Sequence, residues 1–328
     1  MTRHATVPAE PPAPTVLRVR EPGDILGVVP YLLGFHPTES LVAAFVRERR
    51  IRVTARIDLA ATADIEGLVD QLELVGQQVS SRSLVLIGYS ADAGVRELMR
   101  DLADLIPLDL VDVLAVSGDR WWSVCCDGEC CPPEGRSYDI AAHPLAAAAV
   151  VAGISATPSR QEIADLTAGP TDADHDRLSG RAEETARRLA GVGRRRRRQR
   201  MKRLIVSTVR SGGPTEAEAV EIAVLARDVV VRDVAWALMS REDAADHVMV
   251  WHRVVSVAVR PSEAAPLGML AMAAWLSGNG ALLNCCIERL ERVAPDYPLL
   301  QICQEISDQA VPPSRFDAIA EEMRSALV

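Results

Sequence analysis

Five polar side chains near the N-terminal end of the chain are of types that can move protons or bind anions. His36 supplies an imidazole, Glu39 a carboxylate and Ser40 a hydroxyl. Arg56 and Asp58 lie two residues apart in a run typical of a strand, so they share a face. If the strands that carry Ser40 and Asp58 pair as a hairpin, all five form a polar pocket suited to an anion or a proton transfer. The alternative is that Thr38 or Ser40 shapes a turn and Arg56–Asp58 is an internal ion pair.

A second candidate site is the basic run Arg194–Arg203. Residues 181–203 hold eleven basic and two acidic side chains, so the rest of the chain is strongly acidic. Guanidinium groups match phosphate oxygens, which makes phosphate, RNA or DNA a candidate ligand. The alternative is a solvated or self-paired helix face, since acidic stretches near Asp172–Asp176 and Glu216–Glu221 can neutralise the run. The predicted anion-binding residues are Arg194, Arg195, Arg196, Arg197, Arg198 and Arg200.

A third candidate is the cysteine segment that contains Cys126, Cys130 and Cys131. A zinc site requires thiolates that converge from a turn, and Cys126 and Cys130 have a workable separation. A single site would need a further ligand such as His143. We therefore keep three interpretations open: a structural turn with reduced thiols, a redox pair, and zinc. We predict no other cofactor. The chain contains no phosphate-binding P-loop, no dinucleotide glycine fingerprint and no nucleophile elbow, which argues against the common nucleotide and hydrolase chemistries.

The elements that must position these residues fall into two regions. The pattern predicts an α/β domain with a mixed sheet over residues 16–150, after a disordered Pro-rich tail at 1–15. The charged turn Glu48–Arg50 joins two β-rich runs as a hairpin. The predicted strands are Val16–Val19, Ser40–Arg47, Ile51–Leu59, Leu84–Tyr89, Val111–Val116 and Trp121–Cys125, and the predicted helices are Ile25–Leu33, Ile65–Val79 and Val95–Ile106.

Beyond Ala141 strand signals nearly vanish, and residues 151–328 are predicted to form an all-α helical domain. We expect seven or eight helices from Pro144 to Val328, although two runs, Ile205–Val209 and Val229–Val234, are β-branched. Capping-box spacing marks three helix starts. These lie at Ser159–Glu162, Thr215–Glu218 and Ser240–Asp243.

Composition, and the lack of a leader signal in residues 1–15, predict a cytoplasmic protein. The 328 residues carry 36 basic and 45 acidic side chains, a net charge of −9, with ordinary apolar content. Residues 1–15 contain no apolar signal-peptide core, and the longest apolar stretch, Leu145–Ala156, is too short to cross a bilayer. Seven cysteines without an export signal predict reduced thiols. We expect no contact with a membrane.

Several short sequence segments along the chain also resemble those of a known family. They are Pro30–Pro37 (PYLLGFHP), Ala55–Leu59 (ARIDL), Trp122-Ser123, Cys130–Gly135 (CCPPEG), His143–Leu145 (HPL) and Pro158–Arg160 (PSR). In this order they resemble the actinobacterial domain-of-unknown-function family 4192, from about Leu17 to Val311. The resemblance implies no activity, substrate or catalytic residue. It agrees with a bacterial cytoplasmic setting and with 35 arginines beside a single lysine.

A shorter resemblance lies inside the helical region. Pro266–Pro295 is similar in shape to one tetratricopeptide-like helical hairpin, with small Ala271 where two helices approach closely and a turn at Gly278–Gly280. Such units commonly bind proteins on stacked concave faces. The sequence therefore favours a non-catalytic ligand- or protein-binding or regulatory module, with a protein partner on the helical domain and a small anion as a possible ligand. The alternatives are an enzyme that uses the polar pocket, and phosphate or nucleic-acid binding through Arg194–Arg203.

Overall fold

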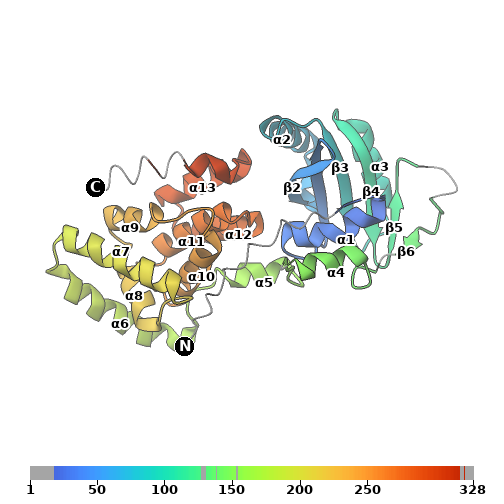
Figure 1. Ribbon diagram of the computed structural model, residues 1–328. Coiled ribbons are helices and arrows are strands. Elements are labelled where there is room, and N and C mark those ends of the chain that lie inside the picture. The colour runs from blue at the N-terminus through green and yellow to red at the C-terminus, as the bar shows by residue number, and fades with distance from the viewer. Residues whose placement is uncertain (1–17, 127–130, 138, 153, 318–320, 322–328) are drawn as a thin grey trace, which may run out of the picture.

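The computed structural model describes residues 18–126, 131–137, 139–152, 154–317 and 321. It consists of a sheet lobe and a helical lobe, which are joined by α4 (Pro144–Val151) and α5 (Arg160–Asp165) (Figure 1). An α/β region thus precedes an all-α region, as the sequence predicts. The predicted tail at residues 1–15 lies outside the described residues.

The sheet has six strands in the order β2-β1-β3-β4-β5-β6. All neighbouring pairs are antiparallel except β3 and β4, which α3 connects as a parallel crossover. The predicted strand at Val16–Val19 is wrong where it can be checked, because Arg18 and Val19 are not in a strand and the other two residues lie outside the described part. The strands are β1 (Ser40–Arg47), β2 (Arg50–Asp58), β3 (Ser83–Tyr89), β4 (Asp109–Ser117), β5 (Arg120–Ser123) and β6 (Arg136–Ser137).

The β1–β2 hairpin has the register that the sequence predicts. Ser40 pairs with Asp58 at the open end and Arg47 with Arg50 at the turn. The turn residues Glu48 and Arg49 both have positive φ, 53° and 60°. Two residues of this conformation match the right-handed twist of the flanking strands, which fixes the register.

Helices cover both faces of the sheet. Alternate side chains of β1 point to opposite faces, so Leu41 and Phe45 pack with α2 and α3 while Val42 packs with α1. Both faces are apolar because both are covered. The helices of this lobe are α1 (Pro22–Leu33), α2 (Ile65–Gln78) and α3 (Val95–Leu105), with a 3₁₀ turn at Leu59–Ala63.

A close helix contact holds α4 on α1. His143 caps α4 by accepting a hydrogen bond from the Leu145 N–H at 3.2 Å. Its ring lies against Gly27 of α1, where an added Cβ would come within 2.3 Å of Nδ1. Only glycine admits the imidazole at this distance.

The helical lobe is built around α11, in which every residue from Ala265 to Leu276 is buried. α10 and α12 pack along it, and Trp275 meets Phe316 edge to face at 5.9 Å between ring centroids. The helices are α6 (Asp172–Ala190), α7 (Arg194–Arg210), α8 (Glu216–Leu225), α9 (Val229–Trp236), α10 (Ala244–Val255), α11 (Ala264–Leu276), α12 (Gly280–Val293) and α13 (Pro298–Asp308).

The described residues from Pro144 onward form ten α-helices, so the expectation of seven or eight was too low. Short helices such as α5 and α9 span only about two turns and give too little periodicity to separate them from their neighbours. The predicted capping box at Thr215–Glu218 is present at the start of α8. At Ser159 the side chain makes no capping bond.

The connection between α1 and β1 ties the two lobes together. Gly34 ends α1 with φ 81°, and Phe35 then pairs with Thr157 in a parallel bridge. The Phe35 ring is 3% exposed and belongs to the core of the helical lobe, where it joins Ile163. One aromatic side chain from the sheet lobe is therefore part of the other lobe's interior.

Replacing Phe35 with alanine is expected to lower the free energy of unfolding by about 3–5 kcal/mol, because a buried ring leaves a cavity in the helical core. Urea denaturation monitored by far-UV circular dichroism measures the loss. The control is Val151→Ala, at a side chain that is 89% exposed, which should change stability by less than about 0.5 kcal/mol. Equal losses for the two variants would contradict this role of Phe35.

Candidate functional site: the polar pocket and the arginine helix

The structure brings together three of the five residues of the predicted polar pocket. Ser40 is buried at the start of β1, and its Oγ donates to the Thr38 carbonyl at 2.6 Å. The same Oγ accepts from Arg56 Nε at 2.8 Å, and Arg56 also pairs with Asp58 at 2.6 Å. These contacts follow from the hairpin register, which sets Ser40 opposite Asp58. They form a closed local network across the open end of the hairpin.

Glu39 and His36 take part in other contacts. The Glu39 carboxylate accepts from Ser90 Oγ and from the Ala91 N–H, each at 2.8 Å, and so fixes the connection between β3 and α3. The backbone N–H of His36 donates to the Thr157 carbonyl at 3.1 Å, within the junction of the lobes. Among the described residues, no hydrogen bond joins the His36 or Glu39 side chain to the Ser40 network.

The Ser40 network lies at the seam between the lobes. Arg160 of α5 pairs with Glu288 of α12. Burial would lower the pKa of Arg160, but Glu288 and, more weakly, Asp58 raise it above the ordinary arginine value. The charges at this seam therefore offset one another, two guanidinium groups against two carboxylates, and leave no surplus for an anion.

The cysteine segment is only partly described. Cys130 lies outside the described residues, whereas Cys126 and Cys131 are half-buried. The following turn is held against β5, because Trp122 Nε1 donates to the Pro133 carbonyl at 3.0 Å. Within the described ranges, no three His, Cys, Asp or Glu side chains are grouped to hold a metal ion. The zinc and redox interpretations of this segment stay predictions.

The remaining cysteines are of a different kind. Cys285, Cys286 and Cys303 are buried in the helical core. Burial raises the pKa of all three thiols, that of Cys303 to about 12. At neutral pH they are protonated, and they pack as small apolar side chains.

The basic run forms the N-terminal half of a single helix, α7, whose inner face packs on the lobe. Met201, Leu204, Ile205 and Thr208 are buried on that face. Like charges three and four residues apart destabilise a helix, and arginines near its N-terminus oppose the macrodipole. The inner arginines therefore need carboxylate partners.

Two acidic residues from elsewhere in the chain supply those partners. Asp228, at the start of α9, pairs with Arg194 at 3.1 Å and with Arg197 at 3.6 Å. Glu221 of α8 is buried and accepts two hydrogen bonds from Arg200, at 2.8 and 3.0 Å. Three of the predicted anion-binding residues, Arg194, Arg197 and Arg200, are thus paired with carboxylates of α8 and of the start of α9.

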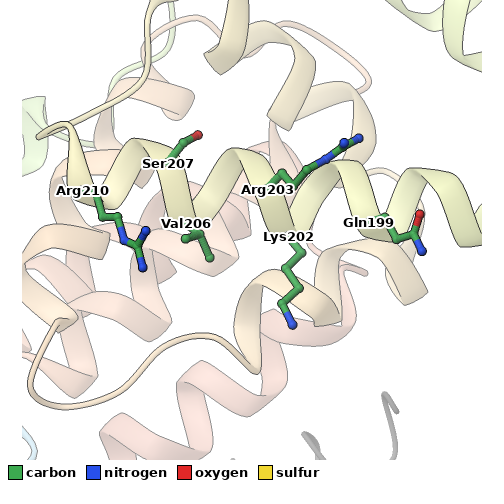
Figure 2. A pocket seen from close by; sticks show the side chains of 6 residues that line it. All are labelled: Gln199, Lys202, Arg203, Val206, Ser207 and Arg210. Carbon is green, nitrogen blue, oxygen red and sulfur yellow. The ribbon is translucent and has the colours of Figure 1, made fainter.

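The outer face of α7 differs from the inner one. Five cations on it are exposed, and none forms an ion pair or a hydrogen bond with another described residue; they are Arg195, Arg196, Lys202, Arg203 and Arg210. Figure 2 shows six side chains along this stretch of the helix, Gln199, Lys202, Arg203, Val206, Ser207 and Arg210, which line an open hollow of about 650 Å³. No acidic side chain is among them. The five exposed cations Arg195, Arg196, Lys202, Arg203 and Arg210 are called the outer stripe below.

Sequence reasoning missed Arg210 and did not separate the paired arginines from the exposed ones. A signal for Arg210 was present, because Arg196, Arg203 and Arg210 recur every seven residues, and a helix brings such positions to nearly the same side. No neighbouring residue in the sequence indicates which arginines of the run are paired and which are exposed. The pairing depends on Glu221 and Asp228, which approach α7 only in the folded chain.

The comparisons with known proteins give one result. The family model described as "Domain of unknown function (DUF4192)" matches residues 22–314. The chain belongs to this family. No curated protein and no solved structure matches it. The actinobacterial origin stays a prediction, and no helix in the described part of this DUF4192 protein is long and apolar enough to span a membrane.

The buried carboxylate of Glu221 yields a test of the inner face. Arg200 holds the pKa of Glu221 below its ordinary value, although burial would raise it. Its stabilising contribution is therefore complete above the ordinary glutamate pKa and is lost as the pH falls through the lowered one. At pH 7, Glu221→Gln is expected to lower the free energy of unfolding by about 2 kcal/mol, because Arg200 loses a charged partner.

Urea unfolding of both proteins between pH 7 and 3 measures this difference, which should shrink below about pH 4. Glu183→Gln is the control, since Glu183 is exposed on α6 and forms no ion pair with another described residue. A difference that stays constant down to pH 3 would contradict the pairing.

Proposed function

We propose that this protein is a non-catalytic binding module that holds the phosphate backbone of a nucleic-acid duplex on the outer face of α7. The observation that carries the proposal is the outer stripe: five exposed cations on one helix, without an ion-pair partner in the described part of the chain. A net charge of −9 makes this concentration of positive charge more distinct. We also propose that the protein is cytoplasmic.

The length of the outer stripe fits a duplex. Arg195 and Arg210 are fifteen residues apart, which corresponds to about 22 Å along a helix axis. A duplex carries about one phosphate charge per 1.7 Å of its axis with both strands counted, so a segment of that length holds roughly 13 phosphates, part of which face the stripe. The cations occur in two pairs and a single residue along this length, and their long side chains can follow the curvature of a backbone.

The side chains around the stripe favour backbone contacts over the other anionic partners. α7 contains no aromatic residue, so bases of a single strand have no ring on which to stack. Val206 is the one apolar residue among those that line the hollow, whose other apolar surface belongs to the stems of polar side chains, so no bulky apolar side chain is present there to insert into a lipid bilayer. Charge without stacking or insertion is typical of sequence-independent binding to phosphates.

The other functions expected from the sequence have less support in the geometry. A tetratricopeptide-like unit at Pro266–Pro295 would present α12 and α13 to a protein partner, since α11 is buried on every side. An enzyme based on the polar pocket would need His36 to join the Ser40 network, to which no described hydrogen bond connects it. The outer stripe requires no rearrangement.

Binding to a fluorescein-labelled 30-base-pair DNA duplex, followed by anisotropy between 50 and 200 mM salt, tests the proposal. Five phosphate contacts predict a slope of log K against log salt of about −4.5. The triple variant Arg195→Gln, Lys202→Gln, Arg203→Gln should reduce the slope to about −1.8, because two contacts remain.

A matched control removes three charges from the other lobe, with Arg49→Gln, Arg82→Gln and Arg100→Gln. These side chains are exposed and form no ion pair with another described residue. The control variant should bind like the wild type. Absence of binding at 50 mM salt, or an equal loss in the two triple variants, would overturn the proposal.

A further inference from the structure

A cavity of about 320 Å³ lies on the other side of α7, away from the outer stripe. It is open to solvent and is bordered by the C-terminal end of α6, the first turns of α7 and the connection between α8 and α9. Leu189, Val224 and Leu225 give it apolar walls, and Ala190 leaves space at the end of α6. A volume of this size is at the lower end of the range of small-molecule sites.

The charged side chains at this cavity are predominantly positive. Arg197 and Arg227 line it together with Asp228, and Arg194 pairs with the same aspartate. Three guanidinium groups against one carboxylate leave a surplus of two positive charges. Arg227 is exposed at the rim and forms no ion pair with another described residue.

One donor at the cavity lacks a partner. Arg197 pairs with Asp228 through its terminal nitrogen at 3.6 Å, but its Nε is buried and has no hydrogen-bond partner. A buried N–H that is left unbonded is less favourable than one that donates to water. The Arg197 side chain is partly exposed, so a ligand oxygen can reach it through atoms other than Nε.

We infer that this cavity binds a small phosphate monoester with a compact apolar body. The phosphoryl oxygens accept from Arg197 and Arg227, since guanidinium groups form charge-assisted bonds to phosphate. The apolar body packs on Leu189 and Val224. Asp228 repels the anion, but its charge is outweighed by the three arginines, and it holds Arg197 in place. This site is independent of the outer stripe and of the function proposed for it.

Calorimetric titration of the full chain with phenyl phosphate tests the inference, with inorganic phosphate and phenol as separate probes. Phenyl phosphate should bind at least about ten-fold more tightly than either, because each probe supplies only one part of the recognition. Arg227→Gln should weaken it about ten-fold by removing one charged hydrogen-bond donor. Ala190→Leu should abolish binding by filling the cavity.

Ala217→Leu is the matched control, since Ala217 is exposed on α8 and does not line the cavity. Failure of the wild type to bind phenyl phosphate, equal affinity for inorganic phosphate, or unchanged binding by both cavity variants would overturn the inference. Ala190→Leu should leave duplex binding unchanged, and the outer-stripe triple variant should keep its affinity for phenyl phosphate. Each proposal can therefore fail without the other.

Discussion

The pairing of α7 arginines with Glu221 and Asp228 is the interaction on which the helical lobe depends. A helix that begins with five arginines carries like charges one turn apart and opposes its own dipole. It can pack against an apolar core only if the cations on its inner side are paired with acidic side chains. Two carboxylates achieve this, one buried on α8 and one at the start of α9.

That pairing also gives α7 two different faces. The inner arginines pair with carboxylates and one of them, Arg197, lines a cavity, whereas the outer cations remain exposed along about 22 Å of helix. The two faces suit different anions. An extended row of charges suits a polymer of phosphates, and a walled cavity with apolar sides suits a single small ester. One helix can therefore serve two binding sites.

The lobes are joined by interior contacts in addition to the chain itself. Phe35 leaves the sheet lobe and is buried in the helical core, beside the backbone bridge to Thr157. Arg160 and Glu288 add an ion pair between α5 and α12 at the same seam. The His36 backbone N–H donates to Thr157 at this junction, whereas the Glu39 carboxylate fixes the connection between β3 and α3 in the sheet lobe. Their hydrogen bonds give the segment a structural task whether or not it binds a ligand.

Much of the sheet lobe could be predicted because its signals are local. The charged turn Glu48–Arg50 fixed the hairpin, and the hairpin register then brought Ser40, Arg56 and Asp58 together. The β-branched runs Ile205–Val209 and Val229–Val234, which the sequence marked as exceptions to the helical pattern, lie in α7 and α9. Their own side chains favour strands, and burial against neighbouring helices overrides that preference.

By itself the sequence determined the order of the α/β and helical regions, the hairpin register and the presence of one concentrated basic segment. Local spacing and turn chemistry are sufficient for these. Only the tertiary structure decided which arginines are neutralised, that Phe35 belongs to the other lobe, and that a charged cavity lies behind α7. Each of these depends on groups that are distant in the chain, and the free energy of an ion pair or a buried ring depends on distance and burial in the folded molecule.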